Sequence, residues 1–133
     1  MDGKKVLEKW LEAFAADVDR KFMGERVLSS GNYLWHVFSW EAVPCLVGDD
    51  ARAAFDAQEY DEAIMFKSGF SWCEDKLTNQ AEAALLENLH YTEKVTAEDI
   101  EKYNDTYIVA KDFSWTYVHT HEEMCGPYFL KLQ

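Results

Sequence analysis

Residues 106–120 read TYIVAKDFSWTYVHT, and this stretch decides the fold class. Thr106–Ala110 and Phe113–Thr120 are both rich in β-branched and aromatic residues, which are the types enriched in strands. Only Lys111 and Asp112 separate the two runs, and so short a connection is typical of a β-hairpin. The stretch therefore predicts a pair of antiparallel strands.

Other segments of the chain also have the residue types of strands. Tyr33–Trp40 (YLWHVFSW) is dominated by bulky aromatic and β-branched residues, which predicts a strand buried on both faces or nearly so. Pro44 lacks a backbone donor and should end this strand or place it at an edge. Ala63–Lys67 (AIMFK) predicts another strand, and Tyr128–Leu130 predicts a last strand at the edge of the sheet.

Helical patterns lie between these segments. Lys4–Val18 predicts an amphipathic helix, because its apolar residues recur every three or four positions. Ala51–Ala57 predicts a short helix after an acidic start, and Asn79–Tyr91 favours a longer one through its Ala and Leu content. Thr96 and the acid three residues later resemble a capping box, which predicts a helix over Ala97–Tyr103.

Length and composition fit one folded domain. The 133 residues are 48% apolar and 29% charged, which is typical of a globular chain and not of a disordered one. We therefore expect a single α+β domain over residues 1–133, with a mostly antiparallel sheet of four to five strands flanked by about three helices. Large aromatic side chains should fill its core, and Trp10, Trp35 and Trp115 are expected to be buried.

The charge of the chain is strongly acidic. Thirteen Lys and Arg against 25 Asp and Glu give a formal net charge of −12, which disfavours binding to nucleic acid or to anionic membranes. Residues 1–40 are balanced, so the excess lies in residues 41–133. Such a surface either steers a basic partner or keeps the protein soluble. The candidate binding residues are Glu41, Asp49, Asp50, Asp56, Glu59, Asp61 and Glu62, with Tyr60 as an aromatic anchor.

The sequence also bears on the compartment. No apolar run is long enough to cross a membrane, and charges interrupt the apolar positions of the N-terminal segment, so no signal peptide is expected. The cysteines Cys45, Cys73 and Cys125 are odd in number and form no CxxC pair, which argues against a disulfide framework. We expect a cytoplasmic protein, with Cys45 and Cys73 as small buried hydrophobic residues.

The arrangement that most resembles a chemical site is HTHEE at residues 119–123. Residues two apart on a strand share a face, so His119 and His121 can point at one ion, with Glu122 or Glu123 as a carboxylate ligand and His36 from a neighbouring strand. This pattern gives an alternative hypothesis of one divalent metal ion in a small metal-dependent enzyme or metal-binding protein. Without that ion, no cofactor is expected, because the chain has no Gly-rich phosphate loop.

The same segment has two further interpretations. Its histidines can simply end the core where an aromatic row meets solvent. The row that shares one face of the strand is Phe113, Trp115, Tyr117, His119 and His121. The second interpretation is a nucleophilic site that uses Cys125 with a histidine and Glu122. Nothing in the sequence provides an oxyanion hole for such a site.

Three short segments resemble a known family. YLWHVFS at Tyr33–Ser39, FSWTYVHTHE at Phe113–Glu122 and GPYF at Gly126–Phe129 resemble an uncharacterised family of small acidic bacterial proteins, a domain of unknown function. The resemblance implies a compact α+β fold in a bacterial cytoplasmic protein, and it brings no activity and no catalytic residue. If the matching segments are neighbours, they form a candidate pocket from Trp35, His36, Trp115, His119, His121 and Glu122.

The sequence thus favours a small acidic binding or regulatory protein, similar to the bacterial immunity proteins that neutralise secreted toxins. The expected partner is a basic protein, because complementary charge accelerates association. The metal-dependent protein that uses the His119 and His121 segment is the alternative.

Overall fold

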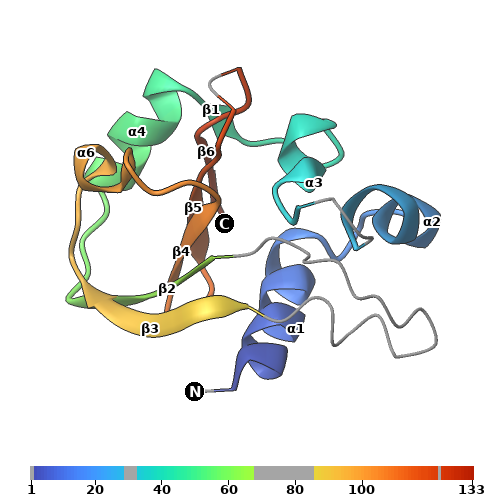
Figure 1. Ribbon diagram of the computed structural model, residues 1–133, viewed down its shortest axis with the longest axis horizontal. Helices are drawn as coiled ribbons and strands as arrows, with labels where there is room; N and C mark the ends of the chain where they lie inside the picture. Colours follow the sequence, from blue (N-terminus) through green and yellow to red (C-terminus); the bar gives the residue numbers. More distant parts are fainter. Residues whose placement is uncertain (1, 29–32, 68–85, 123) are drawn as a thin grey trace.

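The computed structural model describes residues 2–28, 33–67, 86–122 and 124–133. Within these ranges six strands form one antiparallel sheet in the order β1-β6-β5-β4-β2-β3 (Figure 1). The strands are β1 (Leu46–Val47), β2 (Glu62–Lys67), β3 (Glu87–Glu93), β4 (Thr106–Ala110), β5 (Trp115–His119) and β6 (Tyr128–Lys131). The helices are α1 (Gly3–Phe14), α2 (Arg20–Phe22), the π-helix η1 (Met23–Val27), α3 (His36–Ser39), α4 (Asp49–Asp56) and α6 (Ala97–Ile100). The α+β prediction is therefore confirmed, but the described sheet has six strands rather than four to five, and the described α-helices number five rather than about three.

No helix in the described ranges combines the length and the apolar character that crossing a bilayer requires.

The predicted hairpin is present as β4 and β5. Its register pairs Thr106 with His119 and Val109 with Thr116. The connection is longer than two residues, because Phe113 has a positive φ of 58° and the Asp112 carboxylate accepts hydrogen bonds from the backbone and hydroxyl of Ser114. The second strand therefore begins at Trp115 rather than at Phe113.

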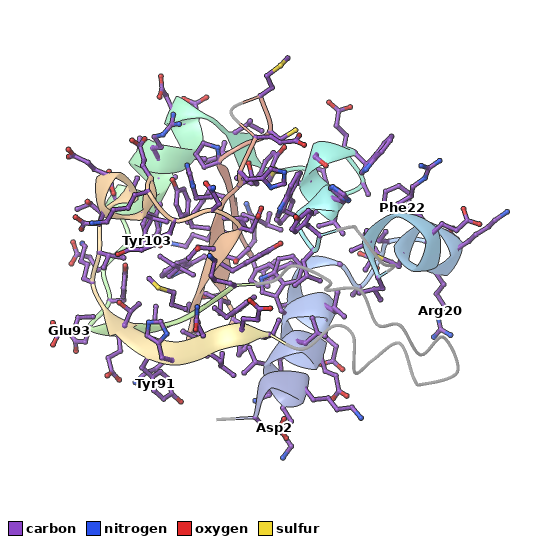
Figure 2. The ribbon with its side chains drawn as sticks, in the orientation of Figure 1. Asp2, Arg20, Phe22, Tyr91, Glu93 and Tyr103 are labelled. Atoms are coloured by element: carbon purple, nitrogen blue, oxygen red, sulfur yellow. The ribbon has the colours of Figure 1, made fainter. Side chains whose placement is uncertain are left out.

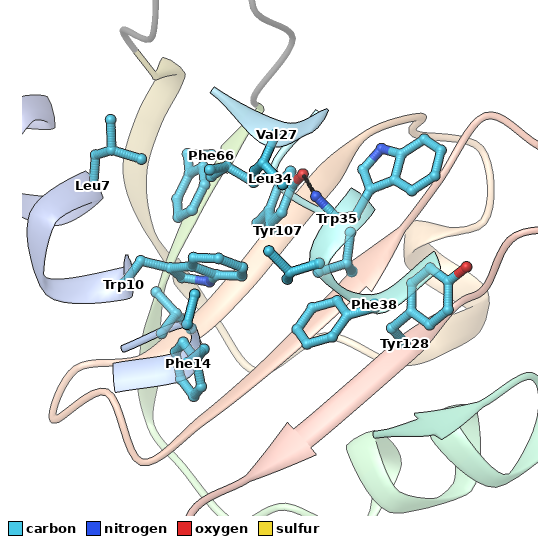
Figure 3. Packing of buried hydrophobic residues seen from close by; sticks show 14 of the residues in the cluster. Leu7, Trp10, Phe14, Val27, Leu34, Trp35, Phe38, Phe66, Tyr107 and Tyr128 are labelled. Carbon is cyan, nitrogen blue, oxygen red and sulfur yellow. Dashed lines mark hydrogen bonds between the residues drawn. The ribbon is translucent and has the colours of Figure 1, made fainter. Parts of the chain in front are cut away.

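The sheet is covered on both faces, and alternate residues of its central strands divide between two clusters. Tyr107 and Val109 of β4 belong to the cluster that α1, η1 and α3 complete, whereas Ile108 and Ala110 belong to the one with α4 and α6. Figure 3 shows the first cluster, in which Trp10 of α1 packs against Tyr107 with ring centroids 5.8 Å apart. The burial predicted for Trp10, Trp35 and Trp115 is confirmed, at 0%, 1% and 4% exposure.

The first helix follows its apolar stripe. The Asp2 side chain caps α1 by accepting a hydrogen bond from the Lys4 backbone, and Val6, Leu7, Trp10 and Phe14 are buried. The helix ends at Phe14 rather than at the predicted Val18. Inside the core, Trp10 Nε1 donates to the Thr116 hydroxyl at 3.1 Å, which attaches the helix to β5.

The strand predicted over Tyr33–Trp40 is wrong. The segment instead forms a turn and the short helix α3. Leu34, Trp35, Val37 and Phe38 are buried. Their packing against the sheet favours a helical turn despite the β-propensity of the residues, because propensity is a weaker determinant than tertiary contact. Trp40, which the strand would have buried, is 54% exposed.

The helix predicted over Asn79–Tyr91 is also wrong where it can be compared. Residues 79–85 lie outside the described ranges, and Glu87–Glu93 form β3, which pairs with β2 in a register that sets Met65 opposite His90. Tyr91, labelled in Figure 2, is half exposed on this outer strand, and Lys111 Nζ lies 5.0 Å from the centre of its ring. Within Glu87–Tyr91, main-chain pairing with β2 gives a strand in place of the predicted helix.

The remaining elements differ in extent. α4 matches the helix predicted over Ala51–Ala57, and the capping box of Thr96 with Asp99 is present, but α6 ends at Ile100 rather than Tyr103. β6 is not an edge strand, because the two-residue β1 pairs with its outer side.

Candidate functional site

One carboxylate, that of Asp105, collects donors from two distant segments. Asp105 precedes β4 with a φ of 52°, a left-handed conformation that Asp tolerates better than most residues. Its Oδ1 accepts a hydrogen bond from Trp35 Nε1 at 2.9 Å and lies 3.0 Å from His121 Nδ1. Because an ionised carboxylate only accepts, Nδ1 of His121 carries the proton, and Nε2 is left for other contacts.

Aromatic rings gather around Trp35, the indole that bonds to this carboxylate. The Trp35 ring lies 5.3 Å from Tyr33 in a stacked arrangement and 5.8 Å from His121, while His36 lies 4.5 Å away. The Trp35 backbone N–H donates to the Tyr107 hydroxyl at 2.8 Å, which Figure 3 shows as a dashed line. Burial, followed by the negative charge of Asp105, raises the pKa of Tyr33. The matching segments at residues 33–39 and 113–122 therefore do meet.

Trp115 does not join them. It packs on the opposite face of the sheet, against Phe55 and Tyr60. The expected aromatic row is likewise wrong at both ends, because β5 covers only residues 115–119. Phe113 packs on the first cluster, and His121 lies beyond the strand against Tyr33 and Trp35.

His119 and His121 nevertheless share a polar cavity of about 470 Å³, here called the histidine cavity. The Nδ1 atom of His119 lies 2.9 Å from the carbonyl oxygen of Tyr103, the residue labelled near α6 in Figure 2. Each histidine is thus oriented through Nδ1 by an acceptor outside the cavity. The cavity is lined by Arg52, Glu101, Asn104, His119, Thr120, His121, Glu122, Cys125, Gly126 and Pro127.

The predicted metal ligands are only partly brought together. His121 Nε2 lies 3.5 Å from Glu122 Oε1, and His119 lines the same cavity, whereas His36 bonds to the Arg26 carbonyl at 3.0 Å. In the part of the chain that the structure describes, no group of three or more His, Cys, Asp or Glu side chains is placed to hold a metal ion. The metal-binding hypothesis stays a prediction.

Cys125 does not have the surroundings of a nucleophile. Its thiol donates to Glu122 Oε2 at 3.2 Å. Burial, followed by the adjacent Glu122, raises the pKa of this thiol, and burial raises the pKa of Cys45 to about 11. Both thiols are therefore held in the protonated, weakly nucleophilic form. Cys45 is half-buried, and Cys73 lies outside the described residues.

The predicted acidic residues are exposed, but they do not all lie on one surface of the protein. Asp49, Asp50 and Asp56 lie on α4, and Glu59, Asp61 and Glu62 follow it into β2. Glu41 lies apart, after α3, which packs on the other face of the sheet. Tyr60 is half-buried, and its hydroxyl exchanges hydrogen bonds with the backbone of Val95.

Tertiary structure adds α6 to this acidic surface. The Ala97 backbone N–H donates to the Asp56 carboxylate at 2.7 Å, and Arg52 Nε donates to Glu101 at 3.1 Å. These bonds place Glu98 and Glu101 beside α4. We call the resulting surface the acidic face, and it consists of Asp49, Asp50, Asp56, Glu59, Asp61, Glu62, Glu98 and Glu101.

Sequence reasoning missed Asp105 as well as Glu98 and Glu101, which lie in α6 and at its C-terminal cap. An Asn-Asp pair directly before a strand was the available signal for Asp105, since both residues tolerate a left-handed conformation. No local signal could have placed α6 beside α4.

Comparison with known protein families finds a match over most of the chain. A family model described as "Domain of unknown function (DUF4275)" matches residues 2–129. Neither a curated protein nor a solved structure matches the chain.

Proposed function

The chain belongs to the DUF4275 family, a domain of unknown function, and we propose from its own surface that it is a binding protein for a basic protein partner. The proposal extends to a regulatory or neutralising role in the bacterial cytoplasm, in the manner of an immunity protein. The acidic face is the contact surface.

The observation that carries this proposal is the joining of α4 and α6 into one exposed acidic surface. Asp56 accepts from the first backbone N–H of α6, and Arg52 bridges Asp49 on its own helix at 2.7 Å and Glu101 at 3.1 Å. Within the described residues, Arg52 and Lys111 are the cations that form ion pairs with this face. The surface therefore keeps a large excess of negative charge.

Such an excess acts mainly on the rate of association. Clustered exposed charges raise the local concentration of a cationic partner and accelerate diffusional encounter, and salt screens the effect over roughly 8 Å at physiological ionic strength. Single exposed ion pairs contribute little to affinity. The expected signature is thus a fast association rate that falls steeply with salt.

The test compares two variants of equal net charge. The face variant carries D49N, D50N, D61N and E62Q, and the matched control carries E8Q, E12Q, D17N and E87Q, which are exposed and outside the acidic face. A partner captured from bacterial lysate on the immobilised wild type is purified, and its association with all three proteins is measured by surface plasmon resonance at low and high salt.

We expect the face variant to associate at least tenfold more slowly at low salt, and the control to stay within twofold of the wild type. Equal slowing in both variants would mean that total charge, and not this face, drives binding. Unchanged association of the face variant would place the contact surface elsewhere.

A further inference from the structure

We propose that the histidine cavity receives a cationic, donor-rich group, the guanidinium or ammonium of an Arg or Lys side chain. The inference rests on the proposed function and identifies which part of the basic partner enters the protein. Arg52 and Glu101 line the cavity and also belong to the α4 and α6 region, so the cavity opens beside the acidic face.

One of the two histidines presents a free acceptor to this cavity. The Tyr103 carbonyl and the Asp105 carboxylate can only accept hydrogen bonds, so Nδ1 of His119 and Nδ1 of His121 each carry a proton. In a neutral ring, Nε2 is then an unprotonated acceptor. Among the described residues, Nε2 of His119 has no hydrogen-bond partner, whereas Nε2 of His121 lies 3.5 Å from the Glu122 carboxylate, which itself only accepts. The free histidine acceptor of the cavity is therefore Nε2 of His119.

The carboxylates that line the cavity also accept hydrogen bonds. Glu122 accepts from the Cys125 thiol through Oε2, which leaves Oε1 near His121. Arg52 is the cation among the lining residues, and its guanidinium is already bonded to Asp49 at 2.7 Å and to Glu101 at 3.1 Å. The acceptors of His119 and Glu122 and the net negative charge of the lining favour a ligand that donates hydrogen bonds and carries positive charge.

The size of the cavity fits this ligand. Sites for drug-sized ligands span roughly 300–1,000 Å³, and a volume of about 470 Å³ lies in the lower part of that range. A side-chain head group with its aliphatic stem fits such a space. An apolar ligand would leave the acceptors of His119 and Glu122 unpaired, at the cost of desolvating them.

The test is a titration followed by amide NMR, with N-acetyl-L-arginine amide as the probe and N-acetyl-L-citrulline amide as its neutral isostere. We expect saturable shifts centred on residues 119–122 and 125–126 with a millimolar Kd, and binding of the citrulline probe at least tenfold weaker. E122Q should weaken the arginine probe at least threefold, whereas E8Q, an exposed position on α1 outside both the acidic face and the cavity lining, should stay within twofold.

Equal binding of the two probes, or shifts confined to the acidic face, would overturn the inference. Site-specific shifts with zinc chloride alone, and none with the arginine probe, would make the cavity a metal site instead. Failure here is separable from failure of the proposed function. If E122Q binds the purified partner normally while the face variant does not, the cavity inference is wrong and the binding function stands.

Discussion

Trp35 Nε1 and His121 Nδ1 lie 2.9 and 3.0 Å from the same oxygen of Asp105. This shared acceptor joins the segment before α3 to the segment after β5, which are far apart in the chain. It also orients the His121 ring, with Nδ1 toward Asp105 and Nε2 toward Glu122 in the histidine cavity. A turn residue thereby connects core packing to the candidate site.

Substitution of Asp105 tests the structural value of this arrangement. Asp105→Ala leaves the indole N–H of Trp35 without its acceptor and places Ala at a φ of 52°, so we expect a loss of about 2–4 kcal/mol in the free energy of unfolding. Asp105→Asn keeps a side chain that accepts hydrogen bonds and tolerates this φ, and should lose about 1 kcal/mol. Urea denaturation measures both, with Asp61→Ala as an exposed control. Equal losses in the two Asp105 variants would contradict this account.

Two buried tyrosines should respond in opposite ways to the loss of a hydroxyl. Tyr107 accepts from the Trp35 backbone N–H at 2.8 Å, and Tyr107→Phe leaves that donor unpaired, at a cost of about 1–3 kcal/mol. The Tyr117 hydroxyl is buried without a partner among the described residues, so Tyr117→Phe should be neutral or stabilise by up to about 1 kcal/mol. Chemical denaturation of Tyr107→Phe and Tyr117→Phe measures the change in the free energy of unfolding. A similar loss in both variants would show that the Tyr117 hydroxyl has a hydrogen-bond partner in solution.

The bond between Trp10 and Thr116 can be measured as a coupling. Thr116→Val preserves shape but removes the acceptor for Trp10 Nε1 and the donor to the Ile108 carbonyl, so the expected loss is about 1–3 kcal/mol. In a Trp10→Phe background the indole donor is already absent, and the same substitution should cost less. A double-mutant cycle in urea gives the difference, and strictly additive losses would mean that the bond contributes nothing.

The capping box of α6 predicts a pH dependence. Hydrogen bonds from the Thr96 backbone, and then from its side chain, lower the pKa of Asp99 below its ordinary value of 3.8. A pKa lowered by folding means that the contribution to stability is complete above the pKa of the unfolded chain and is lost as the pH falls through the folded-state pKa. Asp99→Asn should therefore melt at a lower temperature than the wild type at pH 6. This difference in melting temperature should shrink below about pH 4. A difference that stays constant down to pH 2 would refute the linkage.

Local patterns predicted the parts of this fold that depend on nearest neighbours in sequence. The hairpin of β4 and β5 follows from two strand-like runs with a short connection, and α1 follows from a stripe of apolar residues. The capping box at Thr96 is a contact between residues three apart. Each is stabilised by contacts within a few residues or by one buried face, so the sequence contains the needed information.

The candidate site could be predicted only in part. Trp35, His36 and His121 were expected to meet, and the structure brings them together, but through a helical segment and not through paired strands. Trp115 was grouped with them because strand neighbours were assumed, and it lies on the other face of the sheet.

By itself, the sequence determined an acidic α+β domain with an aromatic core, because composition, charge and apolar periodicity are properties of the chain alone. Only the tertiary structure made residues 36–39 a helix and residues 87–93 a strand, since burial against the sheet and pairing with β2 outweigh local propensity there. It also placed Asp105 between Trp35 and His121, and α6 beside α4. Those relationships depend on hydrogen bonds between residues distant in the chain, which no local pattern encodes.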